Sequence, residues 1–271
     1  MCIIFLFFRI DYSLGHNNFI DKLLFQEYKS NGEANHMKAV VLAGGLGTRL
    51  RPLTYVMPKA MLPVGDKPII EHILNYLKKS HAIDEVIIAT AYLGKYIEDY
   101  LNSGEDFNIS IRYARGKRPL GTAGQLKSAE SFIDDTFLLM NGDILIEVII
   151  SDMIKFHKSK RGVGTVALKP YFLPVKYGVI DTDTDNLILN WREKPNIPLT
   201  MNIGLYVLEP KIFDYIPPER PMSLEREIFP KIIDAGEKLY GFMTETNYLD
   251  IGDLESLDKA HQEFLSKFTL L

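Results

Sequence analysis

A short apolar run followed directly by glycines constrains this chain most. The run "KAVVLA", Lys38 to Ala43, is apolar after its first residue, which is typical of a strand buried on both faces of a parallel sheet. Amphipathic helical segments and further apolar runs alternate from there to Asp143, as in repeated βα units. We therefore expect an α/β fold built on a mostly parallel central sheet.

The second half of the chain contains more strand-like than helix-like segments. Four such segments follow Asp143: "VGTVALK", "YGVIDTD", "LILNWREK" and "NIGLYVLE". They predict antiparallel strands appended to the sheet as the far wall of a cleft. The expected architecture is thus α/β, a Rossmann-like sheet flanked by helices with antiparallel strands added at one side.

Composition narrows the function classes. The formal net charge is −4 with acids and bases interspersed, so the basic stripe that a nucleic-acid partner needs is missing. No apolar run approaches the roughly 20 residues of a membrane span. Cys2 is the single cysteine, which excludes an internal disulfide framework and fits a reducing cytosol, so we expect a cytoplasmic protein.

The first 36 residues differ from the rest. Their apolar patch, Ile3 to Phe8, is shorter than a signal-peptide core and has no basic residue before it. A methionine at position 37 opens "MKAVVLAGG", where the first strand is expected. We expect residues 1–36 to be a disordered extension or a start-site artefact, and residues 37–271 to form the functional domain, without hexapeptide repeats.

The loop behind the first strand combines flexibility with positive charge. Its glycines are Gly44, Gly45 and Gly47, and its cations are Arg49, Arg51 and Lys59. Ligands of open parallel sheets bind at the carboxyl ends of the strands, where glycines let backbone N–H groups approach a phosphate. The P-loop pattern is absent, and Leu50 occupies the third glycine position of the dinucleotide fingerprint, which disfavours a dehydrogenase.

The longer pattern "LAGGLGTRLRPLT", followed by Pro58–Lys59, resembles the signature of the sugar nucleotidyltransferases. The resemblance continues in the family's order through "PLGTAG", "NGD", "YGV", "EKP", "NIGLY" and "YLDIGD". It covers the chain from Met37 to about Leu265. It implies an enzyme that transfers a nucleotidyl group from an NTP to a sugar 1-phosphate and releases pyrophosphate, with those two substrates as its partners.

The resemblance also implies roles for individual residues. The catalytic cations are Arg49, Lys59 and Lys194, of which Lys194 contacts the sugar phosphate. The nucleotide-binding residues are Leu42, Ala43, Gly44, Gly45, Gly47, Thr48, Gly121 and Thr122. The sugar side is lined by Gly178, Glu193 and Asn202. Asp143 and Asp250 match the metal-binding pair, and two carboxylates with phosphate oxygens suit Mg²⁺.

Simpler interpretations exist for several of these residues. "NGD" is ordinary turn chemistry, and Glu193–Lys194 could be a surface ion pair of low value. Trp191 is expected in the core, and Asp253 as the N-cap of the last helix. Within the full series of motifs we favour the functional interpretation of Asp143.

The substrate is less constrained. "PLGTAG", "SLEREIFP" and "YLDIGD" look most like the mannose-1-phosphate guanylyltransferase branch, which implies GTP and GDP-mannose. A glucose-1-phosphate thymidylyltransferase or uridylyltransferase is the alternative, because no single residue decides between these branches. A non-catalytic regulatory subunit that binds NDP-sugars is a further alternative, which the retained charged residues disfavour. The sequence leaves a homo-oligomer open.

Overall fold

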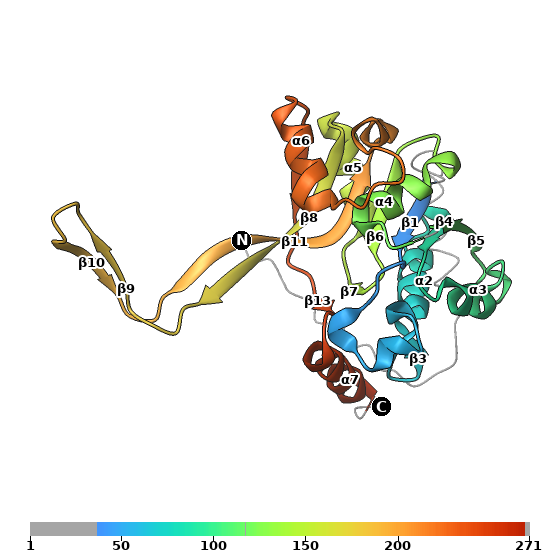
Figure 1. Ribbon diagram of the computed structural model, residues 1–271, viewed down its shortest axis with the longest axis horizontal. Helices are drawn as coiled ribbons and strands as arrows, with labels where there is room; N and C mark the ends of the chain where they lie inside the picture. Colours follow the sequence, from blue (N-terminus) through green and yellow to red (C-terminus); the bar gives the residue numbers. More distant parts are fainter. Residues whose placement is uncertain (1–36, 117, 269–271) are drawn as a thin grey trace, which may run out of the picture. The chain divides into compact units, whose positions relative to one another are not determined.

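A computed structural model describes residues 37–116 and 118–268 of the chain (Figure 1). The predicted N-terminal extension, residues 1–36, lies outside the described residues, so the expectation for it stays a prediction. None of the helices in the described part is long and apolar enough to cross a membrane.

The centre of the fold is a seven-stranded sheet in the order β12-β8-β11-β6-β1-β4-β5. Neighbours pair in parallel except β11, which runs antiparallel to both β6 and β8. The predicted α/β class with a mostly parallel sheet is therefore confirmed. The strands are β1 (Met37–Leu42), β4 (Ile83–Thr90), β5 (Ser110–Arg115), β6 (Phe137–Asn141), β8 (Gly164–Pro174), β11 (Asn196–Leu208) and β12 (Leu239–Met243).

Helices cover both faces of the sheet. Alternate side chains of β1 point to opposite faces, with Ala39 and Val41 in one core cluster and Val40 and Leu42 in the other. The first cluster includes side chains of α2 (Ile69–Lys79), α3 (Gly94–Leu101), α5 (Ile150–Lys160) and α7 (Leu254–Phe268). The second includes side chains of α4 (Gly121–Ser128) and α6 (Phe229–Asp234). Burial on both sides explains why β1 reads as a continuous apolar run.

Two short strand pairs lie outside the central sheet. β2 (Pro63–Val64) pairs with β3 (Lys67–Pro68), and β7 (Ile144–Ile146) pairs antiparallel with β13 (Tyr248–Asp250). The second pair matters for function, because it brings a segment near the C-terminal helix against the segment that follows β6. Figure 1 shows this pair beside α7.

The outer halves of β8 and β11 leave the sheet as a two-stranded ribbon. They lead to a hairpin of β9 (Val179–Thr182) and β10 (Ile188–Arg192), as Figure 1 shows. We call residues 170–200 the arm. The sequence predicted that these strands would form the far wall of a cleft, but β9 and β10 form a separate sheet, and most arm residues are exposed. The alternating pattern indicated strands correctly and gave no information on what covers them.

Side chains cap the start of two helical segments near the end of the chain, and the predicted N-cap at Asp253 is confirmed. The Ser223 side chain accepts a hydrogen bond from the N–H of Arg226, ahead of a π-helical turn (Leu224–Ile228) that runs into α6. The N–H of Ser256 donates to the Asp253 carboxylate at 2.9 Å, and the Ser256 hydroxyl accepts from the Asp253 N–H at 3.0 Å. This reciprocal pair caps the start of α7.

Candidate active site

The glycine loop after β1 is fixed at its ends and open in its middle. The N–H of Gly44 donates to Oε1 of Gln125 at 2.7 Å, and a Cβ at Gly44 would lie only 2.9 Å from that oxygen. Gly47 adopts a left-handed φ of 58°, and its carbonyl accepts from the Thr54 hydroxyl at 2.8 Å. A Cβ at Gly45 would meet nothing within 4 Å. The loop therefore has room for a ligand at its backbone.

The other predicted nucleotide-binding residues of this loop flank the glycines. Leu42 and Ala43 are buried at the end of β1, and the Ala43 N–H donates to the carbonyl of Ala89 at 2.9 Å. Thr48 is exposed and begins the short 3-10 turn that carries Arg49. Leu42 and Ala43 can thus contact a ligand only through their backbone.

Two cations stand beside the loop. The Lys59 ammonium donates to Oδ2 of Asp143, and both side chains are partly buried. The Arg49 guanidinium lies over the backbone of Gly252, where an added Cβ would be 3.2 Å from Nη2. Arg49 and Lys59 therefore place two positive charges at the carboxyl edge of the sheet. Each contacts a residue that is distant in sequence, Gly252 for Arg49 and Asp143 for Lys59.

The two predicted metal-binding aspartates are also brought together. The Ile251 N–H donates to the Asp143 carbonyl at 2.9 Å, and Asp250 pairs with Ile144 across the β7–β13 ladder. Partial burial, followed by the negative charge of Asp143, raises the pKa of Asp250. Two oxygen-donor carboxylates that repel each other are a donor set that a hard divalent cation fits.

The donor set of this pair is small. Among residues 37–116 and 118–268, no group of three or more His, Cys, Asp or Glu side chains is placed to hold a metal ion. Mg²⁺ commonly binds through one or two carboxylates, with water and substrate phosphates completing its shell. The pair is therefore compatible with a cation shared between the protein and a nucleotide.

A hydrogen-bond network joins Gly121 and Thr122, predicted to lie in a loop but found at the start of α4, to the sheet. The Thr122 hydroxyl donates to Oε2 of Glu225 at 2.9 Å and accepts from the N–H of Leu224 at 2.8 Å. On its other oxygen, Glu225 accepts from the Tyr206 hydroxyl at 3.3 Å. Tyr206 in turn accepts from Nδ2 of Asn202 at 2.8 Å. One carboxylate thus links a predicted nucleotide-binding residue to a predicted sugar-binding residue.

Backbone geometry fixes the same start of α4. Gly121 has a left-handed φ of 68°, and a Cβ there would lie 2.4 Å from the carbonyl oxygen of Met222. The Ala123 N–H donates to that carbonyl at 3.0 Å. The first turn of α4 is therefore held closely against the segment that precedes Glu225.

Three other predicted residues are not brought to this edge. Gly178, Glu193 and Lys194 are exposed on the arm. A Cβ at Gly178 would be 3.1 Å from Oε2 of Glu193 and 3.5 Å from Nε1 of Trp191, so these three residues form one surface. The expectation that Trp191 lies in the core is wrong, because its side chain is 61% exposed.

Gln125, Tyr206 and Glu225 contribute to the site without having been assigned a role from the sequence. Gln125 directly follows "PLGTAG", Tyr206 ends "NIGLY", and Glu225 lies in "SLEREIFP". Their roles depend on partners between 19 and 103 residues away, which residue spacing does not reveal. The polar side chain of Gln125 inside the otherwise apolar face of α4 was the one available signal.

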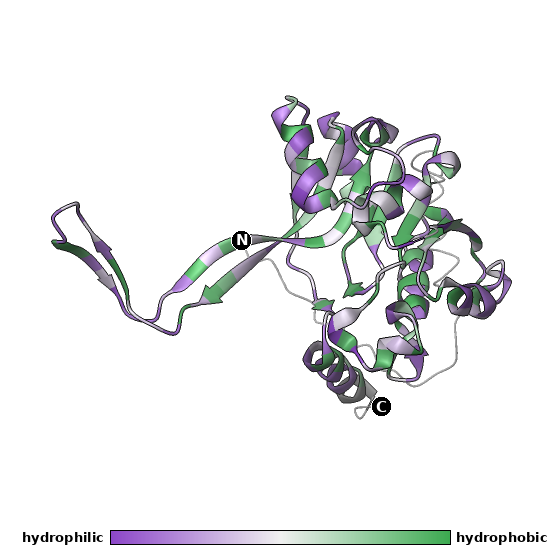
Figure 2. Ribbon diagram, viewed as in Figure 1, coloured by the Kyte–Doolittle hydropathy of each residue, from purple (hydrophilic) through white to green (hydrophobic). Residues whose placement is uncertain are grey.

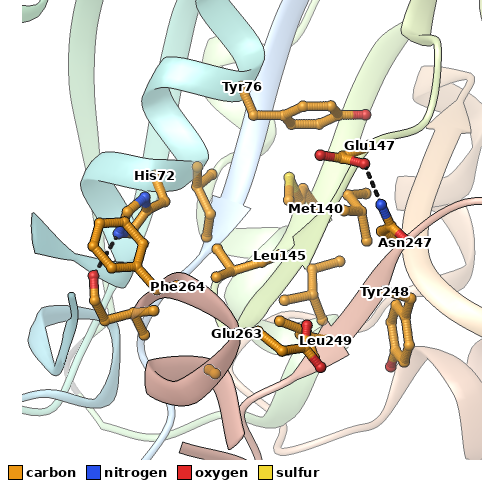
Figure 3. Close-up of a pocket in the computed structure, with 15 residues that line it drawn as sticks. His72, Tyr76, Met140, Leu145, Glu147, Asn247, Tyr248, Leu249, Glu263 and Phe264 are labelled. Atoms are coloured by element: carbon orange, nitrogen blue, oxygen red, sulfur yellow. Dashed lines mark hydrogen bonds between the residues drawn. The ribbon is translucent and has the colours of Figure 1, made fainter. Parts of the chain in front are cut away.

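A separate cavity of about 290 Å³ lies between α2, α7 and the β7–β13 pair (Figure 3). Most of the residues that line it are apolar, and Glu147 accepts from Asn247 at 2.6 Å. None of the predicted catalytic, nucleotide-binding, sugar-binding or metal-binding residues lines it. The cavity is therefore separate from the candidate site.

Comparison with known proteins gives a consistent result. The family model described as nucleotidyl transferase matches residues 38–267. The UTP–glucose-1-phosphate uridylyltransferase of Synechocystis sp. is 34% identical over 249 residues, which cover 85% of this chain and 64% of that protein. The mannose-1-phosphate guanyltransferase of Candida albicans is 36% identical over 250 residues, covering 85% and 68%. The chain thus spans about two thirds of the length of these relatives.

Solved structures show the same fold. HddC from Yersinia pseudotuberculosis, crystallised with GMP-PN, superposes with a TM-score of 0.67 at 28% identity and covers 84% of this chain and 99% of that one. A UDP-glucose pyrophosphorylase complexed with UDP-glucose has a TM-score of 0.64 at 22% identity, covering 86% and 99%. The described architecture therefore recurs in proteins crystallised with nucleotide ligands.

Proposed function

The chain belongs to the nucleotidyl transferase family, and on that premise we propose that it transfers a nucleotidyl group from an NTP to a sugar 1-phosphate. An oxygen of the sugar phosphate would attack the α-phosphorus of the NTP, and the bond from that phosphorus to the β-phosphate would break, releasing pyrophosphate. The observation that carries this proposal is the convergence of the glycine loop, Arg49, Lys59 and the aspartate pair at one sheet edge.

The nucleotide side of the proposed site uses the glycine loop and the two cations. The open backbone at Gly45 would receive the triphosphate, and Arg49 would hold the developing pyrophosphate with its planar fork. Lys59 would place a point charge on a different oxygen. Charge stabilisation of this kind and in-line positioning supply most of the catalysis in phosphoryl chemistry.

We propose Mg²⁺ as the metal held by Asp143 and Asp250. When bound, it would neutralise charge on the reacting phosphates. The protein's own contribution is to hold the two carboxylates side by side through the β7–β13 ladder, with Lys59 hydrogen-bonded to one of them. Thr122, anchored by Glu225, would hold the nucleobase loop in place.

For specificity we propose mannose 1-phosphate and GTP. Support comes from the motifs "PLGTAG", "SLEREIFP" and "YLDIGD", and from the mannose-1-phosphate guanyltransferase relative. A uridylyltransferase acting on glucose 1-phosphate is the second candidate, because the Synechocystis relative carries that name at 34% identity over a similar share of the chain.

The test is pyrophosphate release by the full-length chain with magnesium. Mannose 1-phosphate and glucose 1-phosphate are each assayed with GTP, UTP, dTTP, ATP and CTP. We expect turnover with mannose 1-phosphate and GTP, and none from the Asp143→Asn variant. A preference for glucose 1-phosphate with UTP or dTTP would keep the reaction and replace the substrates. Nucleotide-sugar binding without turnover in any combination would contradict the enzymatic proposal.

A further inference from the structure

The arm exposes an unusual amount of apolar surface. Ten of the twenty large apolar side chains that are exposed in the described part of the chain lie between Tyr171 and Leu199. Figure 2 shows hydrophobic segments along the arm as well as inside the sheet. Exposed apolar surface gathered on one element marks an interaction site in a folded protein. The arm therefore has the composition of a surface that another surface covers.

Both faces of the arm are uncovered. Tyr171, Phe172 and Leu173 are consecutive and all exposed, and so are Leu187, Ile188 and Leu189. Successive side chains of a strand point to opposite faces, so neither face has a covering layer. A two-stranded hairpin without such a layer is only marginally stable in water. Its stability in this protein requires contacts outside the ribbon.

The paired strands β8 and β11 at the base of the arm direct the arm away from the candidate site of the same chain. β8 and β11 stay paired from Leu168–Asn202 to Pro174–Asn196 without a break in register. At about 3.3 Å per residue, this ladder spans roughly 20 Å beyond Asn202. Asn202 itself is at the site, hydrogen-bonded to Tyr206 and next to Gly204, which contacts Asn141. Lys194 lies beyond the far end of the ladder and could reach its own cleft only if the paired strands folded back.

The arm carries two lysines that nothing in the described part of the same chain pairs with. Lys176 and Lys194 are exposed and have no hydrogen-bond or ion-pair partner among residues 37–116 and 118–268. Lys194 has a left-handed φ of 42°, a strained conformation for a residue other than glycine. The negative charges of Asp143 and Asp250, and those of substrate phosphates bound beside them, would attract such lysines. A second copy of the chain offers this edge without bending the ladder.

We propose that the chain forms a two-fold dimer in which each arm lies over the cleft of the other copy. Glu193 and Lys194 of one subunit would then complete the sugar side of its partner's site, with Trp191 beside them as an apolar platform. The roles of Glu193 and Lys194 rest on the proposed function, whereas the docking of the arm does not. A two-fold arrangement makes the exchange reciprocal, so both arms are covered at once.

Docking can be tested without any activity, because Trp191 is the single tryptophan of the chain. Sedimentation velocity and tryptophan emission are followed through a dilution series of the full-length protein. We expect a dimer whose emission lies at shorter wavelength and is poorly quenched by acrylamide, and a dissociated monomer whose emission resembles that of the unfolded chain. A monomer at every concentration, or a dimer with a fully quenchable Trp191, would overturn the proposal.

Exchange is tested by complementation between two inactive variants. Lys194→Ala and Asp143→Asn chains are co-expressed in equal amounts. Half of the dimers are then mixed. In a mixed dimer, one site combines the intact Asp143 of one chain with the intact Lys194 of the other, and the second site carries both substitutions. One site in four is therefore intact overall, and about a quarter of the wild-type rate returns. The matched control combines Lys194→Ala with Glu193→Ala, where each mixed site keeps one damaged arm and no rate returns.

The outcomes separate this proposal from the proposed function. An active wild-type dimer without complementation would show that each arm serves its own site, and would overturn the exchange. A wild-type dimer with a shielded Trp191 but no turnover on any substrate would support arm docking and contradict the proposed function instead.

Discussion

The carboxylate of Glu225 accepts a hydrogen bond of 2.9 Å from the hydroxyl of Thr122, which lies 103 residues earlier in the chain. The same Glu225 oxygen also accepts from the Ser223 hydroxyl at 2.7 Å, and its other oxygen from Tyr206 at 3.3 Å. A single acidic side chain thus joins the loop expected to hold the nucleobase, the segment before α6, and β11. This relationship makes Glu225 a positioning residue for the proposed site.

Replacing Glu225 by Gln should weaken nucleotide binding more than turnover. The variant keeps the shape of the side chain and removes the charged acceptor, and a hydrogen bond to a charged group contributes about 1.5–3 kcal/mol. We expect the KM for the NTP to rise by about 10- to 100-fold, with a smaller change in kcat. Steady-state kinetics at saturating sugar 1-phosphate measure this. An unchanged KM would show that the network does not position the loop, and Arg226→Gln on the exposed neighbouring position serves as control.

Asp143→Asn and Asp250→Asn should each abolish most turnover while leaving the fold intact. The amide keeps the size of the side chain and removes the charge that holds a divalent cation, which supplies several kcal/mol of charge stabilisation. We expect kcat to fall by about 10³-fold or more. Asp134→Asn, whose carboxylate pairs with Lys38 away from the site, is the matched control. Wild-type kcat in either site variant would remove that residue from the metal pair.

Arg49→Ala and Lys59→Ala should lower kcat through loss of charge at the reacting phosphates. By analogy with loss of one oxyanion-hole donor, each cost is about 2.7–4 kcal/mol, or roughly 10²- to 10³-fold in kcat. Lys59→Ala also removes the donor that is hydrogen-bonded to Asp143. The apparent affinity of this variant for magnesium should therefore change as well. Magnesium titrations of both variants separate the two effects. Equal magnesium dependence in the two would contradict the pairing of Lys59 with Asp143.

Asp253 should make stability depend on pH at the acidic end. The N–H of Ser256, followed by its hydroxyl, lowers the pKa of Asp253. Its contribution is therefore present above the unfolded-state pKa of about 3.9 and is lost as the pH falls through the lower folded-state pKa. Asp253→Ala should destabilise the fold at neutral pH, and Asp253→Asn, which retains a cap, should do so less. Urea unfolding at several pH values measures both. A difference between wild type and Asp253→Ala that does not shrink as the pH falls from neutral through the folded-state pKa would contradict this assignment.

The sheet and the glycine loop could be predicted because their signals are local. Strand β1 is buried on both faces, so its sequence is continuously apolar, and the glycines follow it directly. The proximity of Asp143 to Asp250 could be expected only from the resemblance of the motifs, because it depends on the β7–β13 pairing between distant segments. Composition and periodicity carry no information about such a pairing.

The arm could not be predicted for a different reason. Its strands alternate apolar and polar residues in places, as strands covered on one face do, and the sequence does not state which surface provides the cover. Trp191 illustrates this, since a lone tryptophan in a strand is expected in a core, yet it is exposed in the single chain. If the proposed exchange holds, that expectation fails only because the covering surface belongs to another copy.

The most direct measurement of the central claim is phosphorus NMR of the full-length protein with magnesium, GTP and mannose 1-phosphate. Group transfer predicts one inorganic pyrophosphate for each new nucleotide-sugar diphosphate, with loss of the GTP and sugar-phosphate signals in equal amounts. Replacing either substrate by its nearest competitor tests specificity in the same experiment. Formation of orthophosphate, or pyrophosphate accompanied by GMP without a nucleotide sugar, would show hydrolysis and contradict the account.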